Sequence, residues 1–252
     1  MQTTLLGVAV VIILALVAAL VGPLFIDWSQ HRSEFEAQAA WVTGLEFRIK
    51  GRIDTRLLPT PTLTLHDIEV GPPGGGSPVR VRALHVEYEL GALVRGEWRM
   101  SEASLDGPEF EVGLDAAGGA LWPLPASGFA PREVSIQRLS IKDGRATLVH
   151  HASGSRLVLE KIDFAGSLGS LAGPVKGEGA FVAVGHQYPY RIGMSRLADD
   201  GTVKVRLNVD RIEQPLSTDA NISVRIERGA PRFDGTVAFA RPVARAADGG
   251  II

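Results

Sequence analysis

The chain has no cysteine among its 252 residues. This absence excludes disulfide bridges, thiolate metal sites and cysteine nucleophiles, although it does not select a cellular compartment. The chain also lacks an excess of either charge, because 26 basic and 28 acidic residues leave a formal net charge of −2. A nucleic-acid-binding surface would be strongly basic, so we expect no nucleic-acid partner.

Recognisable catalytic motifs are missing as well. Neither the H-E-x-x-H pattern of zinc proteases nor the G-x-S-x-G turn that presents a catalytic serine occurs. His150 and His151 are adjacent, so in a strand they would point to opposite faces and could not easily share a metal. The pair Asp199-Asp200 precedes a glycine and is typical of a turn. We therefore expect no enzyme, with no catalytic residue, no metal site and no cofactor.

The first strong positive signal is an apolar run from Leu5 to Ile26 that contains no charged or polar side chain. As a helix its 22 residues would span roughly 33 Å, close to the bilayer core of about 30 Å. A cleaved signal peptide is the alternative. The run is longer than the usual apolar part of a signal peptide, and residues 1–4 carry no Lys or Arg. We predict an uncleaved transmembrane helix over residues 5–26.

A second, short amphipathic helix is predicted over residues 27–44, beside the membrane. Asp27 or Ser29 can cap its start, and Gly44 can end it. Its apolar face, at helical spacing, would consist of Trp28, Phe35, Ala39 and Val42. Such a helix would either link the membrane segment to a sheet whose end it covers, or act as a gate for something leaving the membrane.

From residue 45 to residue 240 we expect only strands and turns, since apolar and polar side chains alternate with a period of two. The high counts of Gly (29) and Pro (15) suit many turns between short strands. Residues 241–252 show no closing element, so we expect an unstructured tail or a truncation point there. One strand changes parity between Val81 and Leu84, which predicts a bulge at Ala83-Leu84.

Two segments of this region resemble each other. Residues 100–119 align with residues 136–155, so that Ser104-Leu105 meets Ser140-Ile141. Each segment contains a central glycine, which predicts two β-hairpins with glycine turns. The match then reflects either a structural repeat or the turn chemistry that the two hairpins share.

Strands with one apolar face must bury that face. A β-sandwich would bury it against a second sheet, whereas a curved sheet would leave it lining a groove. A dozen strands at about 4.8 Å spacing would form a ribbon of about 60 Å, and a lining of aliphatic side chains would suit acyl chains. Periodicity alone leaves both architectures open. The candidate lining residues are Val203, Val205, Leu207, Val209, Ile222, Val224, Ile226, Phe110, Val112 and Leu114.

The stretch from Val42 to Gly71 carries a recognisable order: a helix, T-G, a strand, a glycine, L-L-P-x-P, a further strand and D-[IV]-x-V. The residues in this order are Thr43, Gly44, Gly51, Leu57, Leu58, Pro59, Pro61, Asp67, Ile68 and Val70. Behind an N-terminal apolar helix, the order resembles the N-terminal region of AsmA-family proteins.

This resemblance implies a single-pass protein of the bacterial inner membrane that takes part in outer-membrane lipid homeostasis. Residues 1–4 would be cytoplasmic and residues 45–240 would form a periplasmic β-rich domain. Charge alone does not decide this orientation. The family also favours the groove, formed by a curved antiparallel sheet or half-barrel with hairpin repeats.

Two functions follow as hypotheses. The first is phospholipid transport or outer-membrane biogenesis, with membrane lipids bound through their acyl chains and other envelope proteins as further candidate partners. The second is a membrane-tethered β-sandwich that acts as a protein-interaction or regulatory module. A membrane-anchored hydrolase finds no support in the motifs.

Overall fold

The computed structural model describes residues 28–43, 45–71, 79–95, 97, 99–114, 134–150, 152–170, 172–211, 216–227 and 230–240. The predicted membrane helix over residues 5–26, residues 1–4 and the tail at 241–252 lie outside these ranges. Within the described ranges, none of the helices combines the length and apolar character needed to cross a membrane.

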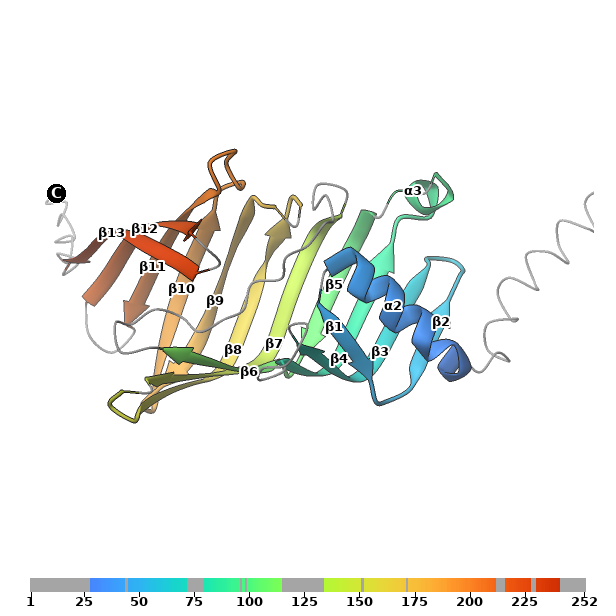
Figure 1. Cartoon of the computed structure of the whole chain (residues 1–252), viewed down its shortest axis with the longest axis horizontal. Coiled ribbons are helices and arrows are strands. Elements are labelled where there is room, and N and C mark those ends of the chain that lie inside the picture. Colours follow the sequence, from blue (N-terminus) through green and yellow to red (C-terminus); the bar gives the residue numbers. More distant parts are fainter. Residues whose placement is uncertain are drawn as a thin grey trace, which may run out of the picture.

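The described residues form one large, curved sheet with a helix lying across one end (Figure 1). A short 3₁₀ turn, η2 (Trp28–His31), leads into α2 (Arg32–Thr43). A second short helix, α3 (Leu90–Val94), connects two strands along the chain. The first seven strands are β1 (Glu46–Ile49), β2 (Ile53–Arg56), β3 (Thr62–Gly71), β4 (Val79–Tyr88), β5 (Arg99–Asp106), β6 (Glu109–Leu114) and β7 (Ser135–His150). The remaining six are β8 (Ser155–Leu168), β9 (Val175–Ala183), β10 (His186–Met194), β11 (Thr202–Arg211), β12 (Leu216–Glu227) and β13 (Ala230–Ala240).

All thirteen strands belong to a single sheet in the order β1-β3-β4-β5-β7-β8-β9-β10-β11-β12-β13, with β2 beside β3 and with β6 beside β4 and β7. The expectation of a mainly β protein with a curved sheet is confirmed. The expectation of a purely antiparallel sheet is wrong, because β5 and β6 both pair with β7 in parallel. The second sheet that a sandwich needs is not present among the described strands.

The parallel pairing explains the internal similarity in a way that the hairpin prediction did not. β5 and β6 pair with β4 and β7 and not with each other, so the first segment is not a hairpin. The turn predicted in the second segment is wrong as well, because β7 runs unbroken through Gly144. The two similar segments instead run side by side, with Ser104 opposite Ser140 and Leu105 opposite Ile141. Both segments cross the same bend in the sheet, at Gly107 and Asp143.

This bend follows a line across the sheet, which we call the crease. It passes through Asp67 of β3, Gly107 between β5 and β6, Asp143 of β7 and Lys161 of β8, whose φ angles are 50°, 56°, 53° and 48°. Left-handed backbone is uncommon outside glycine, and three of these four residues are not glycine, so the row that they form with Gly107 across the sheet marks a built bend. Beyond the crease, β6 and the adjoining ends of the neighbouring strands form the lower border of the sheet (Figure 1).

Each strand that bends at the crease changes which side-chain parity is apolar. In β3 the buried residues are Leu65 before the crease and Ile68 after it. In β4 the corresponding pair, Val81 and Leu84, packs into the same cluster. The predicted parity change is therefore confirmed, but the predicted bulge at Ala83-Leu84 is wrong. The β3–β4 register continues unbroken there because both strands turn together, and the β4–β5 register shifts at Glu87/Tyr88 instead.

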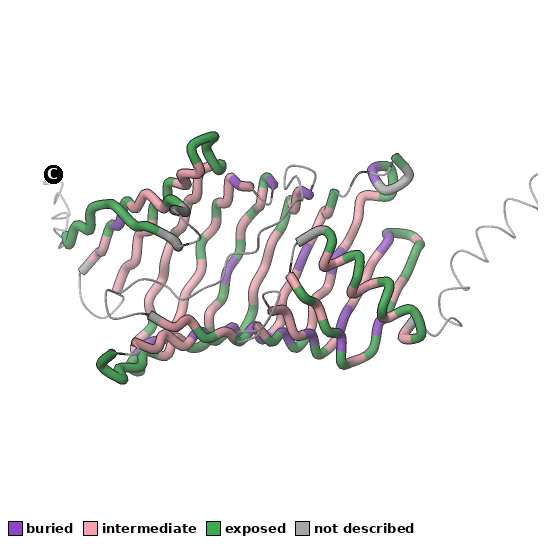
Figure 2. Tube along the Cα trace, in the orientation of Figure 1, coloured by how far each residue is buried: buried purple, intermediate pink, exposed green. Residues whose placement is uncertain are grey.

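A cluster of buried apolar side chains lies inside the crease under α2. The buried cluster there consists of Ile49, Ile53, Leu65, Ile68 and Val81. Phe35 of α2 packs against this cluster, so α2 covers the concave side of the sheet at its N-terminal end (Figures 1 and 2).

Helix α2 also occupies the free edge of β1. The Ile49 amide donates a hydrogen bond to Glu36 Oε1 at 2.6 Å, and Arg32 Nη2 donates one to the Gly51 carbonyl at 3.0 Å. A strand edge with exposed backbone groups is a template for unwanted pairing. These two contacts therefore block extension of the sheet at this end, as the prediction of a helix covering the sheet end anticipated.

Candidate functional site

The concave face of β9 to β12 is an apolar surface that lies apart from the cluster under α2. We call it the concave groove. Cross-strand pairs carry apolar side chains across it: Met194 lies opposite Val205, and Val205 lies opposite Ile222. Ile192 and Leu207 form the next such pair. All five side chains are half-buried rather than buried. A face packed against a second layer would bury them, so no second layer formed by the described residues covers this face.

The structure brings most of the predicted lining residues of β11 and β12 together in this groove. Val203 pairs with Val224, and Val205 pairs with Ile222, while Leu207 and Val209 continue the same face of β11. The side chain of Ile226 lies outside the described part of the structure.

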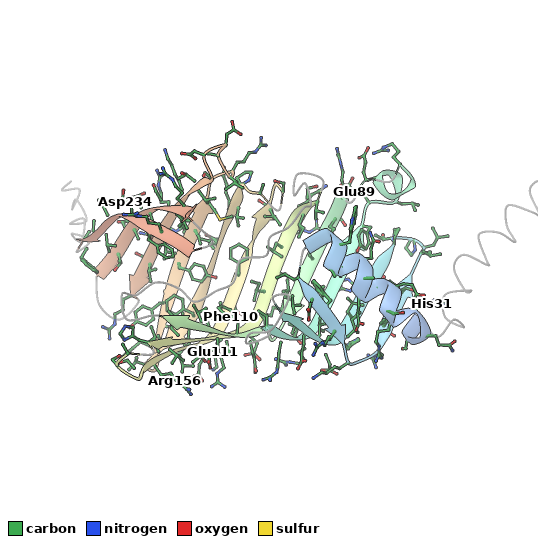
Figure 3. All side chains as sticks on the ribbon, viewed as in Figure 1. His31, Glu89, Phe110, Glu111, Arg156 and Asp234 are labelled. Carbon is green, nitrogen blue, oxygen red and sulfur yellow. The ribbon has the colours of Figure 1, made fainter. Side chains whose placement is uncertain are left out.

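The other predicted lining residues lie beyond the crease, on β6. Phe110 pairs with Ala146 and Val112 pairs with Leu148 of β7. Ala146 is only 2% exposed, so this side of β6 faces the inside of the fold. Phe110 and the neighbouring Glu111 project to opposite sides of the strand (Figure 3). The two predicted groups thus lie on the same side of the sheet, but their strands are not neighbours. The side chain of Leu114 lies outside the described part of the structure.

Glycines on β8 and β9 shape the border of the groove, which the sequence did not predict. A Cβ at Gly177 would overlap the Phe164 ring, and a Cβ at Gly166 would lie 2.6 Å from its Cζ atom. Glycine is therefore required at both positions for this ring to lie flat on the sheet. Phe164 is 8% exposed and forms a smooth apolar floor.

Tyr190 uses a third glycine in the same way. It stands opposite Gly179, where a Cβ would overlap the Asp163 carbonyl. The Tyr190 hydroxyl donates a hydrogen bond to that carbonyl at 3.0 Å. Burial of the ring, together with the nearby Asp163 charge, raises the pKa of Tyr190, so the hydroxyl stays protonated and continues to donate.

An aromatic cluster continues this floor toward the end of β11. The Phe181 and Tyr188 rings stack at 5.4 Å with an interplanar angle of 18°, and the Phe181 and Tyr190 centroids are 5.9 Å apart. The Arg211 guanidinium carbon lies 6.0 Å from the centre of the Tyr188 ring. The sequence could have placed Arg211 on this face, because Arg211 continues the alternation of Val203 to Val209.

The outer face of the sheet carries ion pairs instead. Arg191 and Asp210 approach to 3.6 Å, and Arg82 lies 3.0 Å from Asp143 at the crease. Glu69 accepts a hydrogen bond from Lys50 at 2.7 Å. That bond, with a smaller contribution from Arg80, lowers the pKa of Glu69. Such pairs keep the outer face solvated and distinguish it from the groove.

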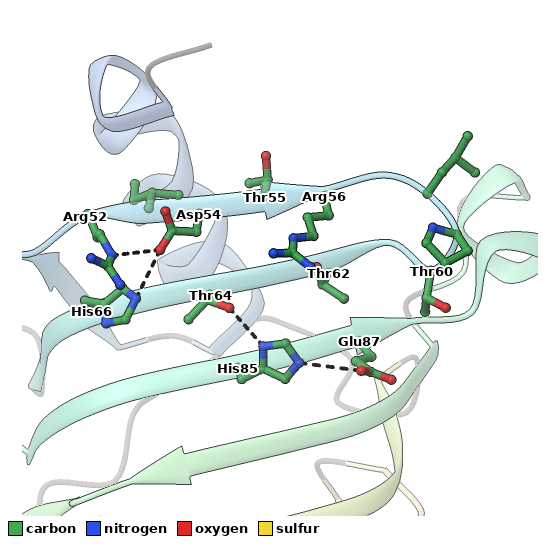
Figure 4. A pocket seen from close by; sticks show the side chains of 13 residues that line it. Arg52, Asp54, Thr55, Arg56, Thr60, Thr62, Thr64, His66, His85 and Glu87 are labelled. Atoms are coloured by element: carbon green, nitrogen blue, oxygen red, sulfur yellow. Dashed lines mark hydrogen bonds and ion pairs between the residues drawn. The ribbon is translucent and has the colours of Figure 1, made fainter. Parts of the chain in front are cut away.

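A cavity of about 810 Å³ opens on the outer side of β2, β3 and β4 (Figure 4). Asp54 contacts His66 at 3.2 Å, while His85 contacts Thr64 at 2.9 Å and Glu87 at 3.6 Å. Its charged lining combines two arginines, Arg52 and Arg56, with two carboxylates. It does not gather one sign of charge, so its chemistry indicates neither a cation nor an anion.

Among the described residues, no group of three or more His, Asp or Glu side chains could hold a metal ion. His150 contacts the Ser153 hydroxyl at 2.7 Å within a turn, and His151 lies outside the described residues.

The signature residues shape the chain rather than supply chemistry. Thr43 is the last residue of α2, and Gly44 lies outside the described ranges. A Cβ on Gly51 would lie 2.5 Å from the His66 carbonyl oxygen, so the β1–β2 corner needs glycine. The carbonyl of the buried Pro61 accepts a hydrogen bond from the Tyr88 amide at 2.8 Å, and Asp67 forms part of the crease.

Pro59 completes the signature in the exposed loop between β2 and β3.

Comparison with protein families matches a model of the AsmA family over residues 2–175, which is more than half of the chain. Comparison with curated proteins and with solved structures returned no match. The matched region begins ahead of α2 and ends at the first residue of β9, so it includes the signature and the whole crease. The chain therefore belongs to the AsmA family.

Proposed function

We propose that this protein binds membrane lipids by their acyl chains in the concave groove and takes part in lipid transport or outer-membrane assembly. The observation that carries the proposal is a half-buried apolar face on a single sheet, which, among the described residues, a helix covers at one end only. Burial of each CH₂ group contributes about 0.8 kcal/mol, so an acyl chain would gain substantially on entering such a face. Membership in the AsmA family supports the same role.

The proposed setting is the bacterial inner membrane. Residues 5–26 anchor the chain with residues 1–4 in the cytoplasm, and the sheet lies in the periplasm, where other envelope proteins can meet it. A reporter fused after Gly71 should then be periplasmic, and residues 5–26 should remain in the mature protein. A mature N-terminus beyond Ile26 would contradict the anchor.

The proposed activity is carriage rather than catalysis, so lipid should leave the protein chemically unchanged. The test is mass spectrometry of lipids that remain bound after purification of the full chain in mild detergent. Intact diacyl lipids at a fixed ratio to protein are the expected result. A lipid-free protein that also takes up none from added vesicles would contradict the proposal.

A second function has one supporting observation. The last strand, β13, exposes Phe233, Val237 and Phe239 to 52%, 55% and 71%. Exposed apolar side chains of this kind often mark protein-interaction sites. If the groove takes no lipid, a membrane-tethered interaction module is the function that these residues favour.

A further inference from the structure

Among the described residues of β9 to β12, the concave groove carries one residue with a formal charge, Arg211. By the alternation of β11, Arg211 lies on the face of Val205, Leu207 and Val209, and its guanidinium lies beside the Tyr188 ring of β10. Over the described residues of β9 to β12, this face otherwise carries apolar side chains, glycines, Thr218, two tyrosines and His186. The charged residues of the same strands, such as Arg206 and Asp210, alternate onto the outer face.

Arg211 lies beside a stacked pair of aromatic rings. Its distance of 6.0 Å from the Tyr188 centroid is at the limit of cation–π attraction, and Tyr188 is itself stacked on Phe181. A guanidinium presents several N–H donors in a planar fork that matches the oxygens of a phosphate. An arginine at the end of an apolar strip therefore offers a contact for a phosphate headgroup next to a surface for acyl chains.

The strip has the length that an amphiphile requires. From Val203 to Arg211 the chain rises about 26 Å at about 3.3 Å per residue. One acyl chain in a bilayer leaflet spans about 15 Å, half of a core of about 30 Å. A lipid lying along β11 could thus place its headgroup at Arg211 with its acyl chains on Leu207, Val205 and Val203.

We propose that Arg211, supported by Tyr188, binds the phosphate of a lipid headgroup, so that the groove prefers anionic amphiphiles over uncharged ones with the same acyl chains. This inference rests on the proposed lipid-binding function. It assigns a defined orientation to the bound lipid, with the headgroup at the end of the groove where the turn connects β9 to β10.

The test compares two probes that share acyl chains, phosphatidic acid and diacylglycerol, bound to the full chain in detergent micelles. The wild type should bind phosphatidic acid about tenfold more tightly, the preference expected of a charge-assisted hydrogen bond. Arg211→Met keeps an apolar stem and should lose this preference while its affinity for diacylglycerol is unchanged. The matched control is Arg206→Met on the outer face, where Arg206 bonds Asn221 Oδ1 at 3.1 Å, and it should behave as the wild type.

The outcomes separate the two proposals. If the wild type binds neither probe, the lipid-binding function itself fails. If the wild type and Arg211→Met bind both probes equally, only the headgroup assignment fails. Inorganic phosphate should not displace phosphatidic acid, and full displacement would mean a simple anion site and overturn the lipid orientation. Arg211→Lys should recover part of the preference, because it restores the charge without the planar fork.

Discussion

Replacing Val205 by Asp places a carboxylate in the middle of the concave groove. Val205 is half-buried, between Met194 on β10 and Ile222 on β12. Complete burial of a valine side chain stabilises a protein by about 1.5–3 kcal/mol, so losing half of that burial costs about 1 kcal/mol. Water reaches an open face, and the carboxylate can stay hydrated there. We therefore expect the variant to lose about 1–2 kcal/mol of unfolding free energy.

For a domain of this size, each kcal/mol shifts the melting temperature by about 2–4 °C. A circular dichroism melt of Val205→Asp should remain cooperative and shift down by about 2–8 °C. The matched control is Ser223→Asp, which introduces the same charge on the other face of β12, opposite Lys204. A solvated substitution of this kind should change the unfolding free energy by less than about 0.5 kcal/mol.

The opposite result has a clear meaning. An unpaired charge in a closed core costs several kcal/mol. If Val205→Asp abolished the cooperative melt while Ser223→Asp did not, the concave face would be a sealed core and the groove reasoning would be refuted. Lipid analysis of the same samples adds a second criterion, since Val205→Asp should lose bound lipid and Ser223→Asp should keep it.

Three other changes test the architecture. In a urea titration, Phe35→Ala should destabilise the protein by about 2 kcal/mol, less than the 3–5 kcal/mol expected for a fully buried Phe. The control is Trp41→Ala, at a residue that is 62% exposed, which should change the unfolding free energy little. Gly177→Val should displace the Phe164 ring and cost about 1–3 kcal/mol by overpacking, with slower lipid uptake; unchanged stability would contradict the glycine floor. The lowered pKa of Glu69 means that its ionised form stabilises the fold above the ordinary value of 4.5 and that this contribution is lost as pH falls through the lower folded value. Melts from pH 3 to 7 should therefore show Glu69→Gln less stable than wild type near neutral pH and equal to it at the acid end.

Strand periodicity predicted much of this fold because it depends on local chemistry. The alternation from Val203 to Val209 is sufficient to place these side chains on one face, and the signature glycine that follows the first strand, Gly51, lies at a corner. The same rule places Arg211 on the apolar face, although its meaning emerges only when Tyr188 from the neighbouring strand lies beside it.

Pairing partners could not be derived in this way. Residues 100–119 and 136–155 have similar sequences, which is compatible with two hairpins or with two neighbouring strands. Only long-range packing selects the parallel arrangement of β5 and β7. The crease was visible as one parity change near Ala83, but its continuation through Asp67, Gly107, Asp143 and Lys161 depends on which strands are adjacent. The glycine floor under Phe164 likewise joins residues from two strands.

The central claim, that acyl chains lie in the concave groove, is tested most directly by photo-crosslinking from two neighbouring positions of β11. Leu207 lies on the concave face, and Arg206, the preceding residue, lies on the outer face. A photo-reactive amino acid at residue 207 should yield a covalent lipid adduct, detected by mass spectrometry of the protein purified from irradiated membranes. The same amino acid at residue 206 should yield none. Equal labelling at both positions, or no lipid adduct at residue 207, would contradict the account.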